Sequence, residues 1–259
     1  IQELISGKEV EDAYQILKDR HLKDYQKLFG SVDVNLDVNK ADYEMTTDEL
    51  LEYVNKGNQS NFFDQLLFQY GRFALIESSR PGTLPAHLQG AWNCFDNPQW
   101  SSGYWHNVNV QMNYWPAFST NIAETFDAYV DFNKAYMKQA QDLANDVINT
   151  HNPSVSGKDG GNGWTIGVAG NAYFISSDRS AGNMGFTTQL FWDYYRYTKD
   201  PEVLENAYKV LVEAARFITK CVKKYDNGYY LVEHSDSPEQ HVNGEWYYTV
   251  GTTYAQSLS

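Results

Sequence analysis

Apolar side chains recur at helical spacing near the start of the chain. Residues 8–29 place them three or four positions apart, which predicts an amphipathic helix; the positions are Val10, Tyr14, Leu17, His21, Tyr25 and Leu28. Residues 31–38 instead alternate Val and Leu with polar residues, which predicts a short half-exposed strand. A short helix is predicted over 47–54, where Gly57 closes it.

Residues 61–78 are apolar on most helical faces. A helix without a polar face is typical of the interior, so we expect this helix to be buried. Gly71 lies inside it and predicts a close approach to another helix.

The rest of the chain alternates helical segments with long polar segments. Helices are predicted at 108–115, 120–148, 184–198, 203–224 and 252–258, and a short strand at 229–232. Residues 152–183 and 233–248 are expected to be irregular. The sequence therefore predicts a mainly α protein. Its helix pairs separated by long loops favour an α/α toroid over a plain helical bundle, because long loops are uncommon in simple bundles.

The segment 84–116 differs from everything around it. It contains four of the seven Trp residues of the chain and is rich in Asn, but its only charged side chain is that of Asp96. Buried amides require hydrogen-bond partners, and flat rings beside amides suit a ligand with apolar faces and hydroxyl groups. This composition therefore suits the binding of a ligand such as a sugar.

Composition excludes several other partners. The net charge of −13 argues against nucleic acid as a partner, because nucleic-acid binding requires clustered Lys and Arg.

Cys94 and Cys221 form no disulfide framework or Cys-x-x-Cys pair. No apolar run reaches the length of a membrane span, and no signal peptide is visible. Because the sequence starts without Met and stops inside a predicted helix, we expect it to be part of a larger protein.

Two groups of residues could carry chemistry. Asn107 and Asn109 project to the same side if the backbone is extended, where their amides could hold one water; alternatively, they cap the helix that follows. Glu239 follows Ser237 and Pro238 in a segment predicted to be irregular. It could be a general acid if buried, or an ordinary solvated glutamate.

Aromatic residues in loops are candidates for sugar stacking. Trp92, Trp100, Trp105 and Trp164 fit this function, whereas Trp115 and Trp192 have helical spacing and are expected to fill the core. The scattered His residues have no metal-site spacing, and no nucleotide-binding or Gly-x-Ser-x-Gly motif occurs. We therefore expect no metal and no cofactor.

Several blocks, taken together, resemble the inverting α-L-fucosidases of glycoside hydrolase family 95. They begin with QYGRFALIESSRPG at 69–82 and LPAHLQGAWN at 84–93. They continue with NVNVQMNYWP at 107–116, and with SPE at 237–239 followed by TYAQS at 253–257. The order is that of the family. The resemblance implies that 61–259 is the first half of an (α/α)6 catalytic domain, and that 1–60 is a linker leading to it.

The resemblance also implies a mechanism. Glu239 would be the general acid, and Asn107 and Asn109 would position the attacking water. The family's base is an Asp in a later motif, which does not occur in this sequence. Trp105, His106, Trp92, Asn93 and Trp164 are the candidate substrate-binding residues.

The implied substrate is a glycan with a terminal, α1,2-linked fucose. The implied partners are the remainder of the catalytic domain and an N-terminal β-domain, and the implied location is secreted, periplasmic or at the cell surface. Two departures leave alternatives open: Trp105 stands where the family often has His or Thr, and the loop 163–170 has no His. The sugar could be L-galactose, or the chain could bind carbohydrate without turnover.

Overall fold

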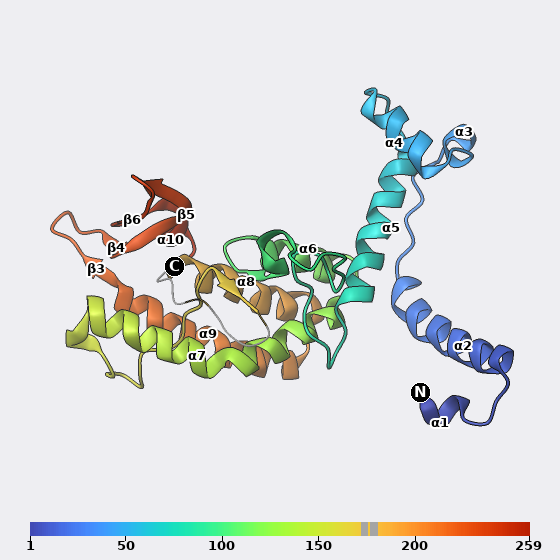
Figure 1. Ribbon diagram of the computed structural model, residues 1–259. Helices are drawn as coiled ribbons and strands as arrows, with labels where there is room; N and C mark the ends of the chain where they lie inside the picture. Colours follow the sequence, from blue (N-terminus) through green and yellow to red (C-terminus); the bar gives the residue numbers. More distant parts are fainter. Residues whose placement is uncertain (172–175, 177–180) are drawn as a thin grey trace.

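A computed structural model describes residues 1–171, 176 and 181–259. Helices dominate it, which confirms the mainly α prediction (Figure 1). The N-terminal part, from α1 to α5, extends away from a body built by α6 to α10 (Figure 1). The candidate residues lie in this body.

The N-terminal part contains four helices before α5. They are α1 (Gln2–Ile5), α2 (Val10–Phe29), α3 (Lys40–Tyr43) and α4 (Thr47–Asn55). The helix predicted over 8–29 is thus confirmed as α2, and α4 begins with a capping box between Thr46 and Glu49.

The strand predicted at 31–38 is wrong. These residues run without helix or strand, and Asp37 has a φ of 57° that interrupts extended backbone. The backbone around Leu36 bonds to side chains: its N–H donates to Gln65 Oε1 at 3.4 Å, and its carbonyl accepts from Asn61 Nδ2 at 2.6 Å. Alternation makes a strand only where a second strand supplies partners, and here helix side chains supply them.

Helix α5 (Asn61–Ser78) has the predicted bounds, and Ser60 caps it by accepting from Phe63 N. The prediction that it is buried is wrong for much of its length, because Leu67, Tyr70 and Phe73 are exposed. The prediction for Gly71 is also wrong: a Cβ there would meet no atom within 4 Å.

The body alternates helices between two layers. Helix α6 (Asn109–Ser119) packs on α8 (Ala181–Thr198), and α8 packs on α10 (Thr253–Ser257). Helix α7 (Asp127–His151) packs on α9 (Pro201–Cys221), with which it runs parallel (Figure 1). Each helix thus contacts its second neighbour in sequence, the pairing expected of an α/α toroid; closure by six pairs stays a prediction.

Aromatic rings fill the space between the two layers. Phe126 stacks on Tyr129 with centroids 5.5 Å apart and meets Phe191 edge-on at 5.3 Å. Phe126 ends the 3-10 helix η2 (Ala123–Phe126), which leads into α7. The hydroxyl of Tyr114 contacts Ser79 Oγ at 2.6 Å and accepts from Ala86 N at 3.0 Å. These contacts attach the loop after α5 to the core.

Trp115 and Trp192 depart from the prediction that they fill the core. Their exposed fractions are 49% and 45%. Each lies on a helix whose buried residues occupy other positions, among them Tyr114 on α6 and Phe191 on α8.

Three short antiparallel pairs complete the described fold. β1 (Tyr104–Trp105) pairs with β2 (Ala169–Gly170), and β3 (Val222–Lys224) pairs with β4 (Tyr230–Val232). The strand predicted at 229–232 is confirmed. The helix predicted over 203–224 is too long, because α9 ends at Cys221 and β3 follows directly.

The segment 233–248, predicted to be irregular, is a hairpin of β5 (Ser235–Val242) and β6 (Glu245–Thr249). Asn243 and Gly244 form its turn with φ of 54° and 84°, the left-handed values of a tight hairpin turn. The Asn-Gly pair is typical of hairpin turns and could have predicted this hairpin from the sequence. The polar composition of β5, with Pro238 inside it, concealed the strand.

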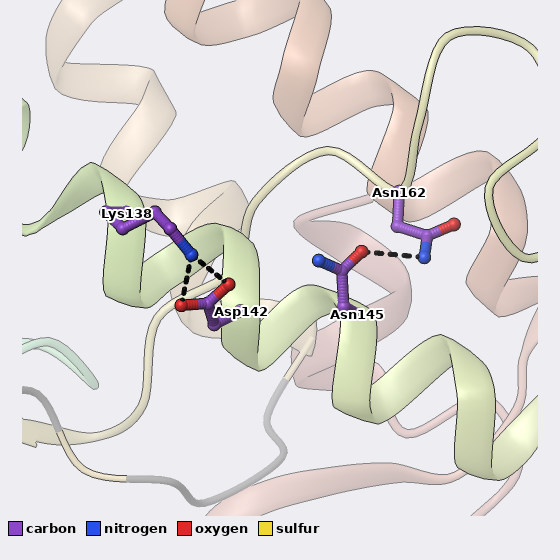
Figure 2. A network of polar contacts seen from close by, with 4 residues as sticks. All are labelled: Lys138, Asp142, Asn145 and Asn162. Atoms are coloured by element: carbon purple, nitrogen blue, oxygen red, sulfur yellow. Dashed lines mark hydrogen bonds and ion pairs between the residues drawn. The ribbon is translucent and has the colours of Figure 1, made fainter.

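The described part of the segment 152–183 begins with the 3-10 helix η3 (Pro153–Val155), and side chains hold the loop that follows it. Asn162 donates to Asn145 Oδ1 of α7 at 2.9 Å, a contact shown in Figure 2. Lys220 of α9 donates to the carbonyls of Val155 and Lys158 at 3.0 and 2.7 Å. On the exposed face of α7, Lys138 pairs with Asp142 one turn away (Figure 2).

Candidate functional site

Asn107 and Asn109 lie where β1 meets α6. The backbone N–H of His106 donates to Val168 O at 2.6 Å, which continues the β1–β2 pairing. The helix cap is Val108, and no side chain makes a capping hydrogen bond there. The alternative in which the two asparagines cap α6 is therefore not what the structure shows.

Asn107 is buried, with an exposed fraction of 8%, whereas Asn109 is partly exposed. The Oδ1 atom of Asn107 has no hydrogen-bond partner among the described residues. A buried amide oxygen without a partner is uncommon in proteins and requires an explanation. An amide oxygen accepts hydrogen bonds, so this atom can bind a donor that the described chain does not supply.

Gln111, one turn into α6, joins this region to α8. Its Nε2 atom donates to His106 O at 2.8 Å and to Thr187 Oγ1 at 3.1 Å. Thr187 in turn donates to the carbonyl of Asn183 at 2.9 Å. Gln111, Thr187 and Asn183 are each fully buried.

Tyr254 of α10 links α8 back to Asn107 by hydrogen bonds. Its hydroxyl is 2.7 Å from Asn183 Oδ1 and 3.4 Å from the carbonyl of Asn107. We call the set of His106, Asn107, Gln111, Asn183, Thr187 and Tyr254 the amide cluster. Three helices of one layer, α6, α8 and α10, contribute to it.

The amide cluster leaves several buried atoms unpaired within the described chain. Besides Asn107 Oδ1, they are Gln111 Oε1, Asn183 Nδ2 and the two ring nitrogens of His106. Gln111 and Asn183 each use one polar atom of the side-chain amide in the protein and leave the other available. Such a set can bind water or sugar hydroxyl groups, which both donate and accept.

His106 is neutral in this environment. It is fully buried beside the rings of Tyr129 and Tyr136, with centroids 6.0 and 6.3 Å away. Burial lowers the pKa of His106 to about 3, and a backbone interaction with Tyr104 opposes this shift only in part. His106 therefore contributes no charge to the cluster near neutral pH.

Glu239 is not joined to the amide cluster. It lies in the irregular part of β5, between the paired residues Asp236 and His241, and its φ is 64°. Its side chain is exposed and makes no hydrogen bond or ion pair with any residue of the described ranges. The base of the hairpin is nevertheless tied to α10, because Thr252 donates to the carbonyl of Asp236 at 2.6 Å.

The tryptophans separate into two groups. Trp92 and Trp100 are exposed, at 51% and 68%, and Trp105 is partly exposed, donating from Nε1 to the carbonyl of Trp100 at 3.1 Å. Trp164 is fully buried and donates from Nε1 to the carbonyl of Val210 at 3.0 Å. It therefore presents no ring face to a sugar.

Gly163 explains why Trp164 is buried. A Cβ at Gly163 would lie 2.0 Å from the carbonyl oxygen of Glu213, so only glycine allows the loop to approach α9 so closely. The neighbouring candidate Asn93 is exposed, and its Oδ1 accepts from Phe95 N at 2.9 Å.

Sequence reasoning missed Asn183, Thr187 and Tyr254 as site residues. Tyr254 lies in the block 253–257 and Gln111 in the block 107–116, so both belong to segments that carry the family resemblance. Nothing in the local sequence distinguishes Asn183 from other asparagines of the chain.

The described residues include neither a metal-binding group nor a membrane-spanning helix. No group of three or more His, Cys, Asp or Glu residues is arranged to hold a metal ion in that part of the chain. Among the helices described, none has the length and apolar character needed to cross a bilayer.

Comparison with known proteins identifies relatives. The family model described as "Glycosyl hydrolase family 95 catalytic domain" matches residues 13–259. "Alpha-L-fucosidase 2" of Arabidopsis thaliana is 32% identical over 240 residues, covering 88% of this chain and 27% of that protein. "Probable alpha-fucosidase A" of Aspergillus niger is 31% identical over 260 residues, covering 95% and 31%. The chain thus spans less than a third of these relatives.

Proposed function

Because the chain belongs to the glycosyl hydrolase family 95 catalytic domain, we propose that its protein hydrolyses glycans ending in α-L-fucose. The family assignment and the two fucosidase relatives support this proposal. We propose an α1,2 linkage and inversion of the anomeric configuration. The proposed location is outside the cytoplasm, where such glycans occur.

The observation that carries the proposal is the buried, unpaired Oδ1 of Asn107 within the described chain. Asn107 and the neighbouring Asn109 hold the attacking water, with an amide oxygen accepting one of its hydrogens. An amide takes no proton itself and adds no negative charge. It can therefore orient a water whose proton passes to a nearby carboxylate.

The reaction balances with two carboxyl groups. Glu239 donates its proton to the glycosidic oxygen as the bond from that oxygen to the anomeric carbon breaks. The oxygen of the water bonds to the opposite face of the same carbon, and a carboxylate base takes a water proton. None of the matched sequence blocks supplies this base, so the remainder of the catalytic domain is the proposed source.

Glu239 has to approach the amide cluster for this reaction, since its side chain is exposed on the hairpin. The left-handed φ of 64° at Glu239 supports a functional role, because such strain concentrates at sites where a side chain is held in a particular direction. Packing of the hairpin against the rest of the domain is the proposed cause of the approach.

Glu239→Gln tests the assignment in the protein that carries this chain. We expect kcat on an α1,2-fucosylated disaccharide to fall about 10²- to 10⁴-fold, because the variant lacks the transferable proton. Glu245→Gln, on β6 of the same hairpin, is the matched control and should retain full activity. The anomer released first, followed by NMR, checks inversion. Unchanged kcat in Glu239→Gln would exclude this residue as the acid.

A second function is carbohydrate binding without turnover. Two features favour binding without turnover. Glu239 is exposed, and Trp105 stands where the family often has His or Thr. Calorimetry with L-fucose and L-galactose, alongside assays on fucosylated and L-galactosylated glycans, separates the possibilities. Saturable binding with no sugar release would support this second function over hydrolysis.

A further inference from the structure

Among the described residues, the hydroxyl of Tyr254 has two acceptors but only one proton to donate. It lies 2.7 Å from Asn183 Oδ1 and 3.4 Å from the carbonyl of Asn107. If the proton goes to Asn183, the carbonyl of Asn107 receives nothing from Tyr254. At the same time Asn183 Nδ2, with two N–H hydrogens, has no partner among the described residues.

Rotation of the Asn183 amide by 180° resolves both problems. Nitrogen and oxygen exchange places, so Nδ2 donates to the Tyr254 oxygen and the Tyr254 proton is free to go to the carbonyl of Asn107. The unpaired group becomes a carbonyl oxygen instead of an NH₂ group. Buried N–H groups without partners are rarer than buried oxygens without them, which favours the rotated amide.

We propose that Asn183 and Tyr254 are positioning residues that hold the peptide between Asn107 and Val108, and thereby the water-holding amide of Asn107. The inference rests on the proposed function, because it assigns these residues to the same reaction. Hydrogen bonds are donated in one direction, from Asn183 to Tyr254 and from Tyr254 to the carbonyl of Asn107. We call this pair of hydrogen bonds the relay.

The packing of α8 against α10 makes this relay possible. Gly182 is next to Asn183, and a Cβ on it would lie 2.4 Å from Cε1 of Tyr254. The ring can therefore reach the carbonyl of Asn107 only because residue 182 has no side chain. Asn183 is fully buried and cannot exchange this partner for bulk water.

The position of the held peptide gives the relay its effect. Val108 has a φ of −168° and a ψ of −35°, so the chain turns sharply between Asn107 and the first helical residue, Asn109. No side chain caps this end of α6. A hydrogen bond on the carbonyl of Asn107 therefore restrains a turn that no capping side chain supports.

The test is Tyr254→Phe in the protein that carries this chain, with Tyr208→Phe as the control because Tyr208 is exposed on α9. We expect kcat on an α1,2-fucosylated disaccharide to fall about tenfold, with KM changed less than about twofold, since a misplaced water slows the reaction without weakening sugar binding. Asn183→Ala should have a similar effect. The double variant should lose little more than either single one, because both act through one relay.

Amide hydrogen exchange of Met112 is a second readout that needs no turnover. Its N–H donates to the carbonyl of Val108 at 2.9 Å, the first hydrogen bond after the restrained turn, so exchange should accelerate about tenfold or more in Tyr254→Phe and Asn183→Ala, but not in Tyr208→Phe. If the parent protein cleaves no fucoside, the proposed function fails and this exchange alone decides the relay. Additive losses in kcat, or unchanged exchange at Met112, would overturn the relay.

Discussion

Arg72 and Asn107 are both polar and buried between helices, but their side chains are partnered very differently. All three guanidinium nitrogens of Arg72 donate to the protein. The acceptors are the carbonyls of Leu28, Phe29, Val32 and Thr120, and the side chains of Gln69 and Ser31. Asn107 Oδ1, in contrast, has no partner in the part of the chain that is described.

The difference shows what each region does. Arg72 joins α5 to the end of α2 and, through Thr120, to the end of α6. A fully satisfied buried cation stabilises the arrangement around it and leaves nothing for a ligand. The amide cluster keeps polar atoms available, at a cost in stability, and is therefore suited to bind something from outside.

Arg72→Met provides the largest expected effect on this comparison. Methionine fills part of the space but leaves buried carbonyls unpaired, so we expect the free energy of unfolding to fall by about 3 kcal/mol. Urea denaturation measures it. Arg196→Met is the control, because Arg196 is exposed and its one partner among the described residues is Asp193 on the same helix, which predicts a loss below about 0.5 kcal/mol. Equal losses in both variants would refute the anchoring role.

The pH dependence of unfolding tests burial in the amide cluster. Since the pKa of His106 is lowered to about 3, the unfolded chain binds a proton below about pH 6.5 that the folded chain refuses. Stability therefore falls as pH drops from about 6.5 towards 3, by about 2 kcal/mol at pH 5 from this residue.

His106→Leu should remove that contribution and flatten the decrease between pH 7 and pH 5. All other titrating groups are common to the two proteins, so the difference between their unfolding curves isolates His106. Parallel curves for the parent and the variant would show that His106 is solvated.

Gln111→Met has the smallest expected effect on stability and sharpens the comparison most. The variant loses the bonds to His106 and Thr187 but also removes the unpaired Oε1, so we expect a net loss of only about 1 kcal/mol. On a fucoside, kcat should fall well beyond what this loss explains. Gln189→Met, at an exposed position of α8, should change neither quantity. A stability loss equal to that of Arg72→Met would place Gln111 among structural anchors.

Much of the fold was predictable from local patterns. Helix α5 has the predicted bounds because its apolar positions are continuous and Ser60 caps it. The strand at 31–38 failed because its alternating pattern specifies a strand only when another strand is adjacent. The β5–β6 hairpin escaped notice because its turn residues were informative but its strand residues were polar.

The candidate site divides in the same way. Asn107 and Asn109 were predicted from a motif, and the structure places them at one helix start, with Asn107 buried. Trp164 was predicted to bind substrate, but the absence of a side chain at Gly163 allows its ring to enter the core. That burial depends on how a loop meets α9, which no local pattern records.

The sequence by itself predicted the longer helices and the family and pointed to Asn107 and Asn109 as candidates, because periodicity, caps and motifs act over a few neighbouring residues. Only the tertiary structure decided which side chains surround those asparagines. Gln111, Asn183 and Tyr254 come from three helices and meet because α6, α8 and α10 pack side by side. Contacts over such sequence separations depend on how whole helices pack, and this is why the pairing of the buried amides emerged only from the fold.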